Sequence, residues 1–106
     1  MVKKITLDLK NQTIEDFHKE IKQKLGFPDF YGANVNALID CMSSMRFPEE
    51  RMSNITLDKD EILIIECKGL SQSNIVVLNN FLISIEHVNQ RELKRGNSPS
   101  IYLCIV

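Results

Sequence analysis

The chain has 106 residues, of which 43% are hydrophobic and 25% are charged, and its formal net charge is −1. This length and balance predict one folded domain over residues 1–106, large enough to bury a core without disulfides or metals. The near-neutral charge argues against a general binder of nucleic acid or membranes, because both partners require a clustered basic surface.

The sequence also predicts a cytoplasmic protein that holds no cofactor and no metal. Asp8 and Lys10 interrupt the apolar stretch that a signal peptide would need, and no apolar run approaches the roughly 20 residues that span a bilayer. Cys41, Cys67 and Cys104 are odd in number and lie in apolar segments, which favours reduced, mostly buried thiols. The chain has no CxxC pair and its histidines are far apart, so a zinc site is not expected.

The first half of the chain predicts a strand and two helices. Residues 2–9 alternate apolar and polar side chains, as a half-buried strand does. Thr13 and Asp16 resemble a capping box that opens a helix, and Gly26 with Pro28 ends it. The apolar stripe of this helix comprises Ile14, Phe17, Ile21 and Leu25. A loop over residues 26–33 follows, and Asn34 is a good N-cap for a second helix over residues 34–45.

The second half predicts two more strands around a long helix. Residues 46–60 are expected to be a polar connection with a weak strand at Ile55–Leu57. The apolar runs 61–67 and 101–106 have the pattern of strands covered on both faces. Between them, Ser71 or Ser73 caps a helix that Gly96 and Pro99 end. Its expected apolar stripe comprises Ile75, Leu78, Leu82 and Ile85, widened by Phe81 and Val88. Strands separated by helices predict an α/β fold with one parallel sheet of three strands and three main helices.

The second helix carries a set of side chains that does not look like plain solvated surface. Opposite the apolar side, which holds Val35, Leu38, Met42 and Met45, the helical spacing places Asn36, Ile39, Asp40 and Ser43 on one stripe. The loop before the helix adds Asp29, Phe30 and Tyr31. Exposed aromatics beside an isoleucine and an acid favour a recognition surface. The simpler interpretation is that the aromatics pack over the helix start and Asp40 is merely solvated.

Residues 25–44, LGFPDFYGANVNALIDCMSS, resemble the signature of the barstar family. The family pattern there is a proline, an acid, two aromatics, Gly, any residue and Asn, followed by a helix that contains an Ala-Leu-Trp-Asp-Cys run. The residues that match in register are Pro28, Asp29, Phe30, Tyr31, Gly32, Asn34, Val35, Ala37, Leu38, Asp40 and Cys41. The order of elements over the whole chain also agrees with the family.

The resemblance implies a ribonuclease inhibitor, or immunity protein, that is not an enzyme. Members fill the active-site cleft of a secreted ribonuclease with the second helix and the preceding loop, and an aspartate matching Asp40 lies where the substrate phosphate would bind. The expected partner is therefore a cognate ribonuclease toxin, with no direct contact to nucleic acid or membrane, and the free inhibitor is expected to be a monomer. The residues implied to bind the partner are Asp29, Phe30, Tyr31, Gly32, Asn34, Asn36, Ile39, Asp40 and Ser43.

The sequence departs from the family pattern inside this surface. Asn36 stands where the family has an acid, Ile39 replaces the tryptophan, and Phe30 lacks the phenol oxygen of the first aromatic. On the last helix the family's acidic contacts fall loosely at Ile83 and His87, with Glu86 nearby. These changes imply a partner that is less basic, or differently shaped, than the ribonuclease that the best-known members inhibit.

Two other functions remain open on the sequence. An enzyme would pair Cys41 as nucleophile with His18 or His87 as base, but Cys41 lies in mid-helix rather than at a helix N-terminus, where thiolates are favoured. His18 is instead expected to be a solvated helix residue. The stronger alternative is a binding module with the same fold whose target is not a ribonuclease, because fold alone does not fix function.

Overall fold

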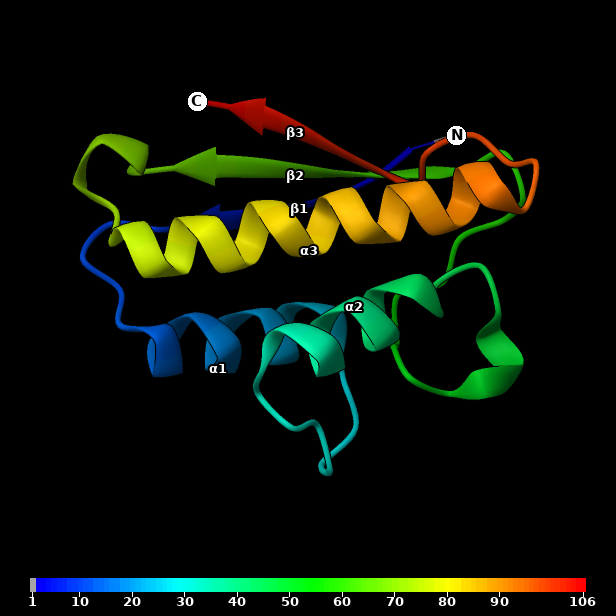
Figure 1. Ribbon diagram of the computed structural model, residues 1–106, viewed down its shortest axis with the longest axis horizontal. Helices are drawn as coiled ribbons and strands as arrows, with labels where there is room; N and C mark the ends of the chain where they lie inside the picture. The colour runs from blue at the N-terminus through cyan, green and yellow to red at the C-terminus, as the bar shows by residue number, and fades with distance from the viewer. Residues whose placement is uncertain (1) are drawn as a thin grey trace.

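A computed structural model describes residues 2–106, and its elements follow the predicted order (Figure 1). The strands are β1 (Val2–Asp8), β2 (Ile62–Lys68) and β3 (Ile101–Ile105), and the helices are α1 (Ile14–Leu25), α2 (Val35–Ser43) and α3 (Ile75–Lys94). Two short 3₁₀ helices, η1 (Pro48–Glu50) and η2 (Leu70–Gln72), lie in the connections. The predicted α/β fold is confirmed, whereas the weak strand expected at Ile55–Leu57 does not form.

The three strands form one parallel sheet in the order β1-β2-β3, with Ile5 beside Ile65 and Ile65 beside Leu103. Figure 1 shows all three helices on the same side of this sheet. Leu63, Ile65 and Cys67 of β2 are buried, but Ile62 and Ile64 are only half-buried. Tyr102 is 45% exposed, and Cys104 is exposed on the same strand. The prediction that these strands are covered on both faces is therefore wrong.

Helix α1 begins and ends as its sequence predicts. The Thr13 side chain accepts a hydrogen bond from the Asp16 N–H, and the Asp16 carboxylate accepts one from the Thr13 N–H. Gly26 ends the helix with φ of 69°, and a Cβ at this position would lie 2.5 Å from the Asn54 side chain. Glycine is needed there because the backbone is left-handed and the 46–60 connection passes so close. The Asn54 N–H donates to the Leu25 carbonyl at 2.9 Å, which ties this connection to the end of α1.

Helix α3 buries part of the expected stripe, since Phe81, Ile85 and Val88 are buried and Leu78 is half-buried against the core. Its N-cap is Asn74 rather than Ser71 or Ser73. Ile75 and Leu82, which were placed on the apolar stripe, are 66% and 42% exposed. The residues that α3 buries are Val77, Phe81, Ser84, Ile85, Val88 and Glu92. The stripe is wider and rotated because α3 is covered by the sheet on one side and by α2 on another (Figure 1).

A buried ion pair joins the end of α2 to the end of α3. Arg46 Nη1 lies 3.0 Å from Glu92 Oε1, and the two side chains are 3% and 2% exposed. Arg46 also donates to the carbonyls of Glu61 and Ser98, both at 2.8 Å. Arg46, the first residue of the predicted polar connection, therefore holds together the end of α2, the end of α3 and the residue before β2.

In the part of the chain that the structure describes, no helix is long and apolar enough to cross a membrane.

Candidate functional site

Helix α2 is positioned by its N-cap and by its buried side. The Asn34 side chain accepts a hydrogen bond from the Ala37 N–H at 2.8 Å and donates to the Gly32 carbonyl at 3.3 Å, so it joins the loop to the first turn. Leu38, Cys41 and Met42 are buried in the core. The helix thus fixes the direction in which its remaining side chains point, which a site on a loop alone would not do.

The predicted surface stripe of α2 is only partly exposed. Asn36 and Asp40 are exposed, as expected, but Ile39 is 6% and Ser43 is 7% exposed. The prediction that Ile39 is an exposed apolar contact is therefore wrong. Helix α2 packs against α3 as well as against the core, so its buried arc is wider than one apolar stripe. In the free protein, the Ile39 side chain packs in the hydrophobic core.

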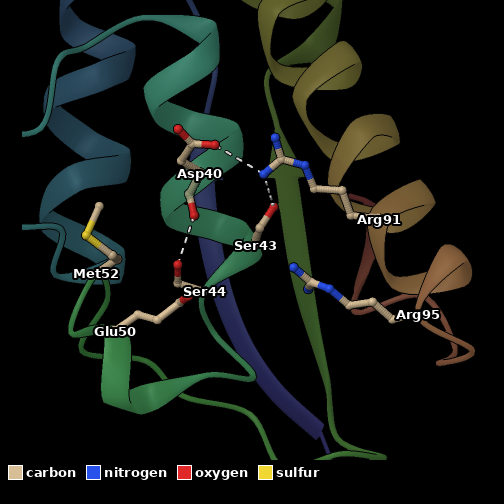
Figure 2. Close-up of a pocket in the computed structure, with 7 residues that line it drawn as sticks. All are labelled: Asp40, Ser43, Ser44, Glu50, Met52, Arg91 and Arg95. Atoms are coloured by element: carbon tan, nitrogen blue, oxygen red, sulfur yellow. Dashed lines mark hydrogen bonds and ion pairs between the residues drawn. The ribbon is translucent and has the colours of Figure 1, made fainter.

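Asp40 is the central charge of the exposed face. Its side chain is 63% exposed, and Oδ1 lies 3.1 Å from Nη1 of Arg91 on α3 (Figure 2). The same nitrogen donates to the Ser43 hydroxyl at 3.2 Å. The second oxygen, Oδ2, makes no hydrogen bond or ion pair within residues 2–106 and remains available. Nothing in the sequence around Asp40 indicates Arg91, since a pair separated by 51 residues leaves no local signal.

The two loop aromatics differ in their surroundings. Phe30 is 75% exposed, next to the exposed Asp29. Tyr31 is half-buried, and the centroids of the Tyr31 and Phe27 rings are 4.9 Å apart. The Tyr31 hydroxyl oxygen lies 2.6 Å from His18 Nδ1. The sequence predicts two exposed aromatics, but Tyr31 packs on α1 and fixes the loop there, whereas Phe30 is presented to solvent. On α3, Ile83, Glu86 and His87 are also exposed.

His18 is 4% exposed, so the expectation that it is solvated is wrong. Burial lowers the pKa of the His18 imidazole below its ordinary value of 6.5, because the charged form loses its hydration. Burial, together with the nearby Cys41, raises the pKa of the Tyr31 phenol well above its ordinary value. The His18–Tyr31 hydrogen bond therefore joins two neutral groups at neutral pH.

The depressed pKa of His18 predicts that the protein loses stability in mild acid. The unfolded chain binds a proton at His18 as the pH falls through about 6.5, while the folded protein resists it. The free energy of unfolding should be level above that pH and should decline below it. Urea denaturation between pH 5 and 8 measures this dependence. His18→Gln should flatten the slope. If the slope of His18→Gln equals that of the parent protein, the assignment to His18 is wrong.

The cysteine in α2 is not set up as a nucleophile. Cys41 is buried, and its pKa is raised to about 11 by that burial and by the negative charge of Asp40. A catalytic thiol needs the opposite shift, toward the thiolate. Within residues 2–106, no three His, Cys, Asp or Glu side chains are grouped so that they could hold a metal ion.

The fold and the exposed face define a small α/β protein with a parallel sheet, helices on one side of it, and a short helix that presents an aspartate beside an exposed aromatic loop. Residues 2–73 match the family model described as Barstar (barnase inhibitor), so the chain belongs to the barstar family. It is also 44% identical over 43 residues to the "Putative ribonuclease inhibitor YrdF" of Bacillus subtilis (strain 168). That match covers 40% of this chain and 47% of the relative, so the chain is aligned with about half of that protein's length.

Proposed function

We propose that this protein inhibits a ribonuclease by inserting α2 and the loop over residues 26–33 into the active-site cleft of the enzyme. The observation that carries the proposal is Asp40, an exposed carboxylate on a rigid helix, at a family position that implies contact with the nuclease. The family name and the name of the Bacillus subtilis relative both refer to ribonuclease inhibition, and they support the same function.

The proposed mechanism is mimicry of one substrate phosphate. A carboxylate carries one negative charge and accepts two parallel hydrogen bonds from a guanidinium group, as a phosphate does. Asp40 Oδ2 is free for such a bond, and Oδ1 can accept more than its single bond to Arg91. Once the cleft is filled, RNA cannot reach the catalytic groups. The inhibitor therefore needs no chemistry of its own.

Phe30 is expected to contribute to the complex and not to the fold, because three quarters of its side chain is exposed. We expect Phe30→Ala to weaken the complex by about 1–2 kcal/mol through lost apolar contact with the enzyme. Calorimetric titration against the ribonuclease measures the loss, and the melting temperature should not change. Tyr31→Phe is the contrasting variant, because it should lower the melting temperature by removing the hydrogen bond to His18. If Phe30→Ala binds the ribonuclease as tightly as the parent protein, Phe30 does not contribute to the interface.

The proposal is tested by titrating the purified protein against two ribonucleases. The first is barnase, the enzyme named in the description of the family, and the second is any secreted nuclease encoded beside this chain's gene. Activity of at least one should fall to zero at one inhibitor per enzyme, and the protein alone should cleave no RNA. The contrary result is that neither ribonuclease is inhibited and that the protein binds a neighbouring gene's product that is not a ribonuclease. In that case the alternative, a binding module with a non-ribonuclease target, is correct.

We further propose that the protein acts as an antitoxin in the bacterial cytoplasm. A cell that makes a secreted ribonuclease must neutralise any copy that reaches its own RNA, so the inhibitor belongs in the same compartment as that RNA. The two buried thiols, Cys41 and Cys67, are consistent with a reducing compartment. A strain that expresses the toxin should survive only when this gene is also expressed.

A further inference from the structure

A pocket lies beside Asp40, between α2 and the last turns of α3, and the proposed mechanism does not use it. Its volume is about 490 Å³, and it opens to solvent on the same face as Asp40. Figure 2 shows Arg91 and Arg95 reaching from α3 toward α2 on one side, while Glu50 comes from η1 on the other. The hydroxyls of Ser43, the last residue of α2, and of Ser44, its C-cap, lie between them.

Arg91 and Arg95 are both held in place by hydrogen bonds that use only some of their N–H donors. Arg91 uses Nη1 for Asp40 and Ser43. Arg95 donates from Nη1 to Glu92 Oε2 at 2.6 Å, and its guanidinium carbon lies 4.5 Å from the centre of the Phe47 ring. The Nη2 and Nε groups of Arg91 and Arg95 make no hydrogen bond within residues 2–106. Each guanidinium therefore offers oriented donors whose fork geometry matches a carboxylate.

The charges in this cluster balance, but its ion pairs leave Glu50 and part of both exposed guanidinium groups unused. Three arginines, Arg46, Arg91 and Arg95, share ion pairs with only two acids, Asp40 and Glu92. Glu50 is the remaining acid at the pocket, and it makes no ion pair within residues 2–106. A carboxylate placed near Arg91 and Arg95 would accept hydrogen bonds from the N–H groups that neither arginine uses.

We propose that this pocket receives an acidic side chain of the ribonuclease, beside the cation that meets Asp40. The proposal rests on the proposed function and adds the charge pattern of the partner. The partner must present an acid next to a base, so that the Asp40–Arg91 pair becomes part of a four-charge network across the interface. A cleft that is only basic would bury the unused N–H groups of Arg91 and Arg95 against like charge and without an acceptor, which is costly. Arg91 and Arg95 therefore act as specificity determinants that select against uniformly basic nucleases.

The first experiment compares arginine variants against the ribonuclease that the parent protein inhibits. Arg91→Gln and Arg95→Gln should each raise the dissociation constant about tenfold or more, since each removes one side of a buried interfacial charge pair. Arg91→Lys should lose less, because it keeps the charge. Lys94→Gln is the matched control, as it removes the same charge from an exposed position on the same helix outside the pocket. Melting curves separate any loss of folding in Arg95→Gln from the loss of binding.

The second experiment identifies the carboxylate. Each aspartate and glutamate at the rim of the ribonuclease cleft is replaced by its amide and tested against the parent inhibitor and Arg95→Gln. One replacement should weaken binding of the parent but have little further effect on Arg95→Gln, which is the signature of a direct pair. Inorganic phosphate titrated into the inhibitor alone should show no binding in calorimetry.

The outcomes separate this proposal from the function on which it rests. If Asp40→Ala weakens inhibition but both arginine variants bind like the parent, the function stands and the carboxylate pocket is wrong. The pocket assignment is also overturned if the arginines matter but no partner acid couples to them and phosphate binds the inhibitor alone, since the site would then hold a free anion. If no ribonuclease is inhibited, the function and the pocket fall together.

Discussion

Asp40→Ala is expected to weaken the inhibitor–ribonuclease complex by about 2–4 kcal/mol, the range of a central interface residue. The loss should appear mainly as faster dissociation, because the substitution leaves the enzyme's cationic groups buried without a partner. The folding stability should change by less than about 1 kcal/mol, since the Asp40–Arg91 pair is exposed and such pairs contribute little. Dissociation rates and urea denaturation curves of the variant and the parent measure the two effects.

The control for Asp40→Ala has to be an acid outside the pocket. Glu50, which the polar composition of residues 46–60 would suggest, lines the same pocket as Asp40 and is unsuitable. Asp60 is exposed in the turn before β2 and does not line this pocket, so Asp60→Ala should leave dissociation unchanged. An Asp40→Ala protein that dissociates as slowly as the parent would rule out phosphate mimicry at this position.

Among the variants proposed here, Arg46→Ala is expected to lower the free energy of unfolding most, by about 3 kcal/mol or more. The reason is that it removes one ion-pair partner of the buried Glu92 carboxylate. Arg95 still contacts Glu92 after the change and keeps the loss toward the lower end of the range for buried pairs. Urea denaturation measures the effect. Lys4→Ala removes the exposed pair between Lys4 and Glu66 and should cost less than about 1 kcal/mol.

A double variant separates the cost of an unpaired charge from the value of the pair. Arg46→Met combined with Glu92→Leu replaces both charges with apolar side chains of similar size, and it should be less destabilising than the sum of the two single changes. Additive losses would show that Arg46 and Glu92 do not act as a pair.

The elements that the sequence predicted correctly are those with local signals. The capping box at Thr13, the N-cap at Asn34 and the left-handed Gly26 each involve residues only a few positions apart, so they are visible in one stretch of sequence. The exposed Asp40 also follows from helical spacing. The resemblance to the barstar signature was equally local, because it lies within residues 25–44.

The features that the sequence did not predict depend on contacts between distant segments. Ile39 is buried because α3 lies against α2, and the spacing within α2 contains no trace of that neighbour. The pairs Arg91–Asp40 and Arg46–Glu92 join residues separated by 51 and 46 positions. The apolar runs of β2 and β3 indicated cover on both faces, yet all three helices lie on one side of the sheet.

The one-sided arrangement of sheet and helices has a practical value for measuring these complexes. In Figure 1 both ends of the chain lie on the sheet side of the molecule, whereas α2 and the loop over residues 26–33 lie on the opposite side. A biotin tag or a fusion partner attached at either end would therefore leave the Asp40 face pointing away from a sensor chip. The same immobilised protein can then be exposed to a series of nucleases, so that the parent and its charge variants are ranked by residence time on one surface chemistry.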